Sequence, residues 1–184
     1  MRGNRRHFIT KRFDRIHNKK VHIQTLNGLA HVDYKMPGTF SYAELFGIAR
    51  QLKFSAAEAE QILKRIVFNI VARNHDDHAK NFAFILKNNK WSLAPAYDLA
   101  YSYKPGSKWV NSHWMSLNGK RDHFTRDDFY SLEKLSPLFS RKKIDVIIKE
   151  TIEHISNWRQ LAKEWDVPRT LIDEINKNLR LKIY

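Results

Sequence analysis

The chain has 184 residues, 42% of them hydrophobic and 12% aromatic, so it can fold as one domain and is not a disordered protein. It has no apolar run of about 18 residues that could span a bilayer, and no cysteine, which excludes disulfides and thiolate chemistry and fits a cytoplasmic setting. A surplus of 33 Lys and Arg over 19 Asp and Glu gives a net charge of +14, which predicts attraction to polyanions.

The N-terminal part of the chain predicts extended segments and then a short helix. His7–Phe13 is rich in aromatic and β-branched residues, which is typical of a strand. Val21–Val32 predicts a second extended piece with a turn signal inside it, the Asn-Gly pair. Ser41 followed by Glu44 forms a capping box, so a helix is expected over the residues that follow.

A second capping box predicts a longer helix in the middle of the chain. Ser55 and Glu58 have the same spacing, and the helix should run to about Arg73. Its apolar residues recur with the period of one buried helical face: Ala59, Ile62, Leu63, Ile66, Val67 and Ile70.

The next segments predict a hairpin, an irregular region and a helical C-terminal part. Phe82–Leu86 and Trp91–Ala94 read as two strands joined by a polar turn. Tyr97–Arg126 predicts a long irregular region, which is often functional in a compact domain. Three helices are expected after it, at Arg126–Leu135, Arg141–Glu164 and Pro168–Leu181. The fold class is therefore α+β and mostly α-helical.

The stretch "RNHDDHAKN" after the central helix allows three interpretations. His75, Asp76, Asp77 and His78 could hold a catalytic metal as in a phosphohydrolase, although neighbouring residues on a helix diverge by about 100°. Asp76 or Asp77 could instead satisfy backbone groups at the turn after the helix, with the histidines as surface polar residues. The third interpretation is a kinase catalytic loop, because Asp76 precedes Asn81 with the D-x-x-x-x-N spacing of such loops.

The predicted hairpin adds a geometric reason for the kinase interpretation. Asn81 lies just before its first strand and Asp98 follows its second, so an antiparallel hairpin returns both to the same open end. An amide oxygen and a carboxylate there could share Mg²⁺, which prefers hard oxygen ligands. Lys80 is positioned to neutralise a transferring phosphoryl group, although a solvated surface lysine is the simpler alternative.

These residues resemble the HipA family of bacterial serine/threonine kinases, the toxin halves of HipA–HipB toxin–antitoxin pairs. Four segments carry the resemblance: "RFDR" at Arg12–Arg15, "FNIVARNHDDHAKNFAFIL" at Phe68–Leu86, "LAPAYDL" at Leu93–Leu99, and the loop ending "HWMSLNGK". The resemblance implies a kinase-like C-terminal lobe in which the hairpin carries the metal-binding residues. It divides the chain into a hinge strand with a connecting segment, residues 1–40, and a helical lobe, residues 41–184.

By position, the resemblance implies Asp76 as the catalytic base and Asn81 and Asp98 as the Mg²⁺ ligands, and it gives Asp77 no catalytic role. The implied ATP site comprises a hinge of Lys11, Arg12 and Phe13, the run His78, Ala79, Lys80 and Asn81, and the pair Tyr97 and Asp98. Phe13 could equally be a core residue at a strand end.

The resemblance also implies partners. These are a HipB-like DNA-binding antitoxin, DNA through that antitoxin, and a protein substrate such as an aminoacyl-tRNA synthetase. None of the six glycines forms a phosphate-cradling loop, so the small lobe of a kinase is expected to be missing or to come from a separate subunit. Kinase activity of the isolated chain should then be impaired. The alternative function is a non-catalytic basic module that binds an antitoxin or nucleic acid.

Overall fold

Two serine caps start the helices at the centre of the fold. The hydroxyls of Ser41 and Ser55 each accept a hydrogen bond from the backbone N–H of the glutamate three residues later, whose side chain bonds back to the serine N–H. Both helices predicted from these capping boxes are confirmed, as α2 (Tyr42–Gln51) and α3 (Ala56–Val71). The predicted apolar face of α3 is fully buried at Ile62, Leu63, Ile66, Val67 and Ile70.

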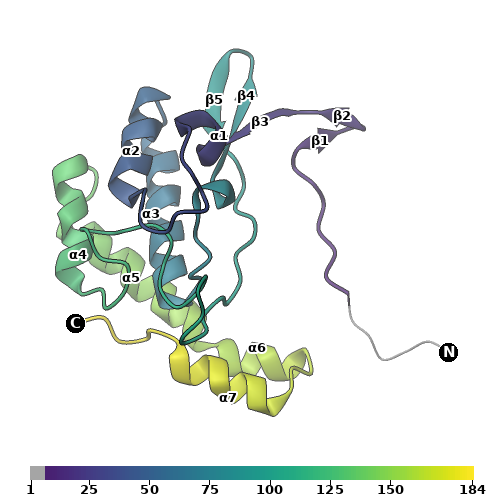
Figure 1. Ribbon diagram of the computed structural model, residues 1–184, viewed down its shortest axis with the longest axis vertical. Coiled ribbons are helices and arrows are strands. Elements are labelled where there is room, and N and C mark those ends of the chain that lie inside the picture. The colour runs from purple at the N-terminus through teal and green to yellow at the C-terminus, as the bar shows by residue number, and fades with distance from the viewer. Residues whose placement is uncertain (1–6) are drawn as a thin grey trace.

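The computed structural model describes residues 7–184, and α3 lies at its centre (Figure 1). The other elements in chain order are β1 (Arg15–Ile16), β2 (Lys19–Lys20), β3 (His22–Thr25), α1 (Leu26–Ala30), the 3-10 helix η1 (Ala79–Asn81), β4 (Ala83–Lys87), β5 (Lys90–Leu93), α4 (Arg126–Tyr130), the 3-10 helix η2 (Ser131–Leu135), α5 (Arg141–Ser156), α6 (Trp158–Glu164) and α7 (Arg169–Asn178). Helices α2 and α5 pack on α3. The fold is thus mixed α+β and mostly helical, as the sequence predicts.

The hairpin β4–β5 forms where it is predicted. Its strands pair antiparallel, and the two residues between them, Asn88 and Asn89, both have positive φ, 51° and 58°. This is the backbone of a tight two-residue hairpin turn, which asparagine tolerates well. Strand β3 pairs with the other edge of β4 and completes a three-stranded sheet.

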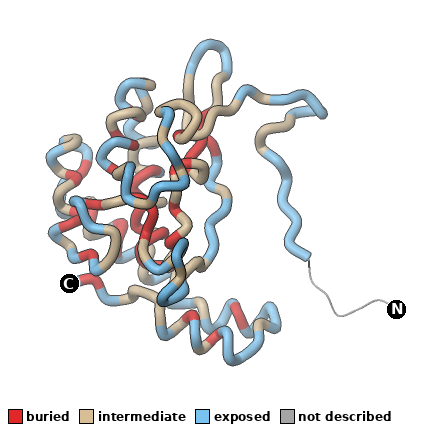
Figure 2. Tube along the Cα trace, in the orientation of Figure 1, coloured by how far each residue is buried: buried red, intermediate tan, exposed pale blue. Residues whose placement is uncertain are grey.

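The predicted strand at His7–Phe13 is wrong. Regular pairing begins only at Arg15, and the side chains of Phe8 and Ile9 are 93% and 88% exposed. The apolar pattern of this segment therefore finds no core to pack against, and it extends from the body as an exposed arm (Figures 1 and 2).

The second extended prediction, Val21–Val32, is correct only in its first half. The Thr25 side chain accepts a hydrogen bond from the N–H of Gly28, which starts helix α1 where a hairpin turn was expected. The Asn27 side chain donates to the Val32 carbonyl and so closes the end of that short helix. Local capping has outweighed the turn signal.

The C-terminal part is helical as predicted, with different ends. The single helix expected over Arg141–Glu164 is divided at Asn157 into α5 and α6. Helix α7 ends at Asn178, because the N–H of Arg180 donates to the Val71 carbonyl at the end of α3 and so draws the chain out of the helix.

Buried residues gather around α3 and the helices beside it (Figure 2). The region 97–125 contains no helix or named strand, as predicted, and runs over one side of this core. No helix within residues 7–184 has both the length and the apolar content needed to cross a membrane.

Candidate functional site

The chain turns sharply after α3, and the candidate residues follow this turn. Arg73 has a left-handed backbone, φ 57°, and the N–H of Asn74 donates to the Asn69 carbonyl at 2.8 Å. The side chain of Asn74 also donates to that of Asn69. Residues 74–78 have no regular secondary structure, and they contact the loop that contains His113 and Trp114.

Asp77 is the anchor between this segment and the irregular loop. Its side chain is completely buried, and one carboxylate oxygen accepts hydrogen bonds from the Tyr42 hydroxyl and, at 2.8 Å, from the His113 ring. The other oxygen accepts the backbone N–H of Trp114 at 2.7 Å. The structural interpretation therefore applies to Asp77, but the backbone groups it satisfies belong to a loop far along the chain. Sequence reasoning missed His113 and Tyr42 for the same reason.

Asp76 is the adjacent acid and has the opposite environment. Its side chain is 41% exposed, and one of its carboxylate oxygens lies 3.6 Å from Nε2 of the His78 ring. Burial raises the pKa of Asp76 above its ordinary value, and the negative charge of Asp98 raises it further, while His78 opposes the rise. Asp76 and Asp98 thus lie within electrostatic reach of each other.

Asn81 is oriented by Asp76. Its side-chain Nδ2 donates to the Asp76 carbonyl at 2.8 Å, and its N–H donates to the His78 carbonyl within η1. Because the nitrogen of the amide is committed to that bond, the oxygen is the end left to meet a ligand. Asn81 also shares a small hollow with Tyr97, the residue before Asp98. A hydrogen bond thus joins Asn81 to Asp76, and Asp98 directly follows Tyr97, which lines the same hollow as Asn81.

Tyr97 and Asp98 follow β5 and turn back toward η1. The Tyr97 hydroxyl donates to the Lys80 carbonyl, which ties the two segments together. Asp98 has a left-handed backbone, φ 54°, a conformation that is uncommon outside glycine and clusters at functional sites. Burial raises the pKa of Tyr97 to about 12, so its hydroxyl remains a donor at neutral pH.

The donor set at this end of the hairpin fits Mg²⁺ rather than a transition metal. It offers the amide oxygen of Asn81 and the carboxylates of Asp98 and Asp76, which are hard oxygen ligands. A divalent cation would also relieve the repulsion between the two acids. Among residues 7–184 no three His, Cys, Asp or Glu side chains come together as a metal cluster, so the phosphohydrolase interpretation has no support there.

Neither the side chain of Lys80 nor that of Ala79 is free to contact a ligand in the structure. The Lys80 ammonium lies 3.2 Å from the centroid of the Tyr34 ring, and its charge lowers the pKa of Tyr34. To reach a phosphoryl group, this side chain must leave that ring. Ala79 is buried, so only its backbone is available to a ligand.

The predicted hinge lies beside the same region. The Phe13 ring is 5.7 Å from the Tyr97 ring, measured between centroids. Arg12 is held by two hydrogen bonds to Asp14, and Lys11 is exposed. The three predicted hinge residues line a hollow of about 350 Å³ together with Arg15, Ile16 and His17.

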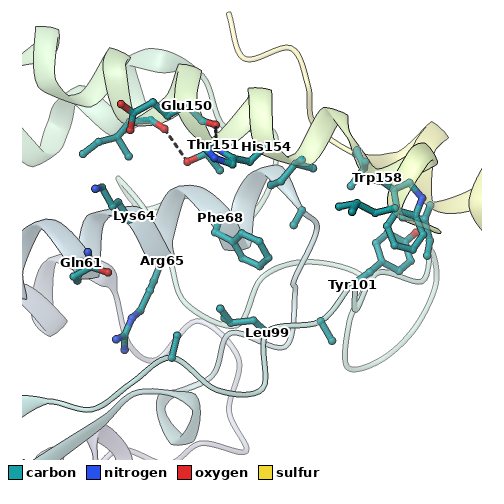
Figure 3. Close-up of a pocket in the computed structure, with 18 residues that line it drawn as sticks. Gln61, Lys64, Arg65, Phe68, Leu99, Tyr101, Glu150, Thr151, His154 and Trp158 are labelled. Atoms are coloured by element: carbon teal, nitrogen blue, oxygen red, sulfur yellow. Dashed lines mark hydrogen bonds between the residues drawn. The ribbon is translucent and has the colours of Figure 1, made fainter. Parts of the chain in front are cut away.

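An apolar cavity lies beside the segment that contains Asp98 and has different chemistry. It measures about 620 Å³ and is bounded by α3, α5, α6, α7 and the segment that follows Asp98 (Figure 3). Its walls are mainly apolar, with Phe68, Leu99 and Trp158 facing the space. Asp76, Asn81 and Asp98 are absent from its lining.

Comparisons with known proteins find relatives that match most of this chain. The chain is 26% identical over 202 aligned positions to a protein of Haemophilus influenzae named "Putative kinase", covering 96% of this chain and 59% of that protein. It is 27% identical over 173 positions to "Putative kinase Y4dM" of Sinorhizobium fredii, covering 90% of this chain and 41% of that protein. This chain therefore spans about half the length of these relatives.

A solved structure shares the fold. The HipA chain in a Shewanella oneidensis complex of HipA, HipB and operator DNA matches with a TM-score of 0.67 and 18% identity, over 91% of this chain and 45% of that one. The family model described as HipA-like C-terminal domain matches residues 1–159. The chain belongs to the HipA-like C-terminal domain family.

Proposed function

We propose that this chain forms the Mg²⁺-binding and catalytic half of an ATP-dependent serine/threonine protein kinase. The observation that carries the proposal is the hydrogen bond from the Asn81 side chain to the Asp76 carbonyl, in a region where Asn81 shares a hollow with Tyr97, the residue before Asp98. The kinase names of the relatives and the family of the chain support it.

Each residue of the cluster has a separate task in this proposal. The exposed carboxylate of Asp76 orients the substrate hydroxyl and accepts its proton, and its raised pKa makes it a stronger base than an ordinary aspartate. Asn81 and Asp98 hold Mg²⁺, which when bound neutralises charge on the phosphates of ATP. Lys80 adds positive charge once it leaves Tyr34.

The ATP site in this proposal also uses residues on either side of the cluster. The backbone of Lys11, Arg12 and Phe13 meets the adenine, and the segments 78–81 and 97–98 enclose the phosphates. We propose that residues 1–40 act as the hinge and connecting segment and residues 41–184 as the lobe. A second element, in a longer polypeptide or a separate small-lobe subunit, supplies the remaining phosphate contacts, and the chain alone transfers little or no phosphate.

The relationship of this chain to HipA also suggests partners. The solved relative is bound to HipB and operator DNA. By analogy we propose a HipB-like DNA-binding antitoxin as a partner, DNA contact through it, and a protein substrate such as an aminoacyl-tRNA synthetase.

A second candidate function is a non-catalytic basic binding module. It is favoured by the net charge of +14 and by the exposed basic residues near the N-terminus. These are Lys11 and Arg12 in the arm and Lys19 and Lys20 in β2. Such a module should bind polyanions with an affinity that falls steeply with salt and that does not respond to Asp76→Ala or Asp98→Ala.

Titration of a fluorescent ATP analogue against the purified chain separates these functions. We expect weak binding that requires Mg²⁺ and is lost in Asn81→Ala and in Asp98→Ala. The control Asp127→Ala removes an exposed acid from the first turn of α4 and should bind like the wild type. Binding that is equal in all three variants, or equal in EDTA, would overturn the proposed site.

A phosphoryl-transfer assay on the same samples tests the need for a second element. Micromolar ATP affinity together with transfer that Asp76→Ala abolishes would show that this chain needs no second element.

A further inference from the structure

A row of aromatic rings leads from the candidate catalytic acid to the protein surface. The His78 ring, beside Asp76, lies edge-on to the Trp114 ring with centroids 5.8 Å apart. Trp114 in turn stacks in parallel on Trp109, with centroids 5.9 Å apart and an interplanar angle of 4°. Trp109 is 51% exposed, whereas Trp114 is buried. The row therefore ends in an indole that is open to solvent.

The loop that carries Trp109 is held in shape by its own hydrogen bonds. The N–H of Lys104 donates to the Val110 carbonyl at 3.3 Å, and the N–H of Gly106 donates to the Asn111 side chain at 2.8 Å. The Ser107 hydroxyl accepts the N–H groups of Trp109 and Val110. An exposed indole on a preformed loop loses little conformational freedom on binding, which is the property of an interface anchor.

The segment of chain that contains this indole carries only basic charges. Residues 99–121 contain four basic residues, Lys104, Lys108, Lys120 and Arg121, and no Asp or Glu. The Lys108 ammonium lies 4.8 Å from the centroid of the Trp109 ring. A side chain that packs on Trp109 would thus have a cation beside it.

We propose that Trp109, with Lys104 and Lys108, forms the docking platform for the segment of the protein substrate next to the phosphorylated hydroxyl. The segment it fits carries an aromatic side chain, which packs on the indole, and carboxylates, which pair with the two lysines. This inference rests on the proposed kinase function and deepens it, because it assigns the class of substrate sequence.

Three fluorescein-labelled peptides test the platform by fluorescence anisotropy with the full chain. The first has a central serine flanked by phenylalanine and glutamate on both sides; the second replaces both phenylalanines by alanine; the third replaces the glutamates by lysine. We expect the first to bind best, the second about tenfold more weakly, and the third weakest of all. Equal affinity for the first two peptides would overturn the aromatic part of the proposal.

Variants assign the effect to the platform. Trp109→Ala should weaken the first peptide about tenfold without changing the second, and Trp109→Tyr should restore most of the affinity. Trp165→Ala, which removes an exposed indole at the end of α6, is the control and should bind like the wild type. Lys108→Gln should weaken both acidic peptides. A Trp109→Ala protein that binds the first peptide as tightly as the wild type would contradict the proposal.

Nucleotide binding distinguishes failure of the platform from failure of the kinase function. Trp109→Ala should keep Mg²⁺-dependent ATP binding, and Asp98→Ala should lose it while keeping peptide binding. If Asp98→Ala leaves ATP binding unchanged, the kinase proposal fails. If Trp109→Ala leaves peptide binding unchanged, the platform fails.

Discussion

Asp76 and Asp77 are neighbours in sequence with separate physical roles. Asp77 is sealed inside the protein with four hydrogen-bond donors around it, from Tyr42, His113, Trp114 and Met115. Asp76 is partly exposed and lies beside the His78 ring. One carboxylate therefore holds the irregular loop to the end of α3, and the other is left available for chemistry.

Removal of the Asp77 carboxylate should destabilise the fold severely. In Asp77→Ala the N–H of Trp114 and the His113 ring lose their acceptor in a site without water access, so the free energy of unfolding should fall by about 3–5 kcal/mol. Urea denaturation measures this loss. Asp76→Ala is the matched control, and a loss below about 1 kcal/mol for Asp77→Ala would contradict the anchoring role.

Asp76→Asn should have the opposite effect on stability. The folded-state pKa of Asp76 lies above its ordinary value, so the ionised side chain destabilises the fold at neutral pH. The penalty disappears as the pH falls through that raised pKa, because the group becomes neutral. We expect Asp76→Asn to raise Tm at pH 7, with a gain that shrinks as the pH approaches about 4. A lower Tm at pH 7 would show that Asp76 contributes to stability instead.

Sequence alone could suggest the candidate residues of the site but not their surroundings. The spacing of Asp76 and Asn81 and the hairpin before Asp98 are local features, and both can be read from the chain. The partners of Asp77 come from a loop more than thirty positions away, and no periodicity links them. The contact of Lys80 with Tyr34 could not be predicted from the sequence for the same reason.

At the level of elements, the two capping boxes look alike but have different consequences. Among residues 7–184, Glu44 forms side-chain hydrogen bonds only with Ser41, within its own box. Glu58 caps α3 through one carboxylate oxygen and accepts the N–H of Leu93 at 2.9 Å through the other. It therefore links the start of α3 to the strand whose end leads to Asp98.

Glu58→Ala should cost more stability than Glu44→Ala. Burial pushes the pKa of Glu58 up, but the hydrogen bonds from Ser55 and Leu93 outweigh it, so the net shift is downward and the ionised form is stabilising. We expect Glu58→Ala to lose about 1 kcal/mol more than Glu44→Ala at pH 7 by urea denaturation. The excess should decrease as the pH falls through the lowered pKa of Glu58. Equal losses in both variants would contradict the link to β5.

Helices with strong local signals were predictable, and segments without a core contact were not. Capping boxes predicted α2 and α3, and the periodic apolar residues of α3 supported its prediction, because each of these signals lies within a single helix. The strand at His7–Phe13 failed because strand propensity has no effect without a partner strand. The break at Asn157 could not be predicted from an apolar pattern that continues across it.

For the whole molecule, the N-terminal arm lies to one side of the helical body (Figure 1), and an apolar cavity lies among α3, α5, α6 and α7 (Figure 3). The arm reaches the cluster through the contact of Phe13 with Tyr97. The chain spans about half of its relatives, and we propose that the rest of the ATP site is completed from outside the residues described here.

Paramagnetic broadening by Mn²⁺ with ATP tests the central claim most directly. Mn²⁺ binds the oxygen ligands that suit Mg²⁺, and it broadens the NMR signals of nearby groups. In a ¹⁵N-labelled sample we expect the first signals lost to be the side-chain amide of Asn81 and the backbone amides of residues 76–81 and 97–98. The Asp98→Ala protein should keep these signals. Broadening that centres on the basic arm or on α5, or that persists in Asp98→Ala, would contradict a Mg²⁺–ATP site at the end of the hairpin.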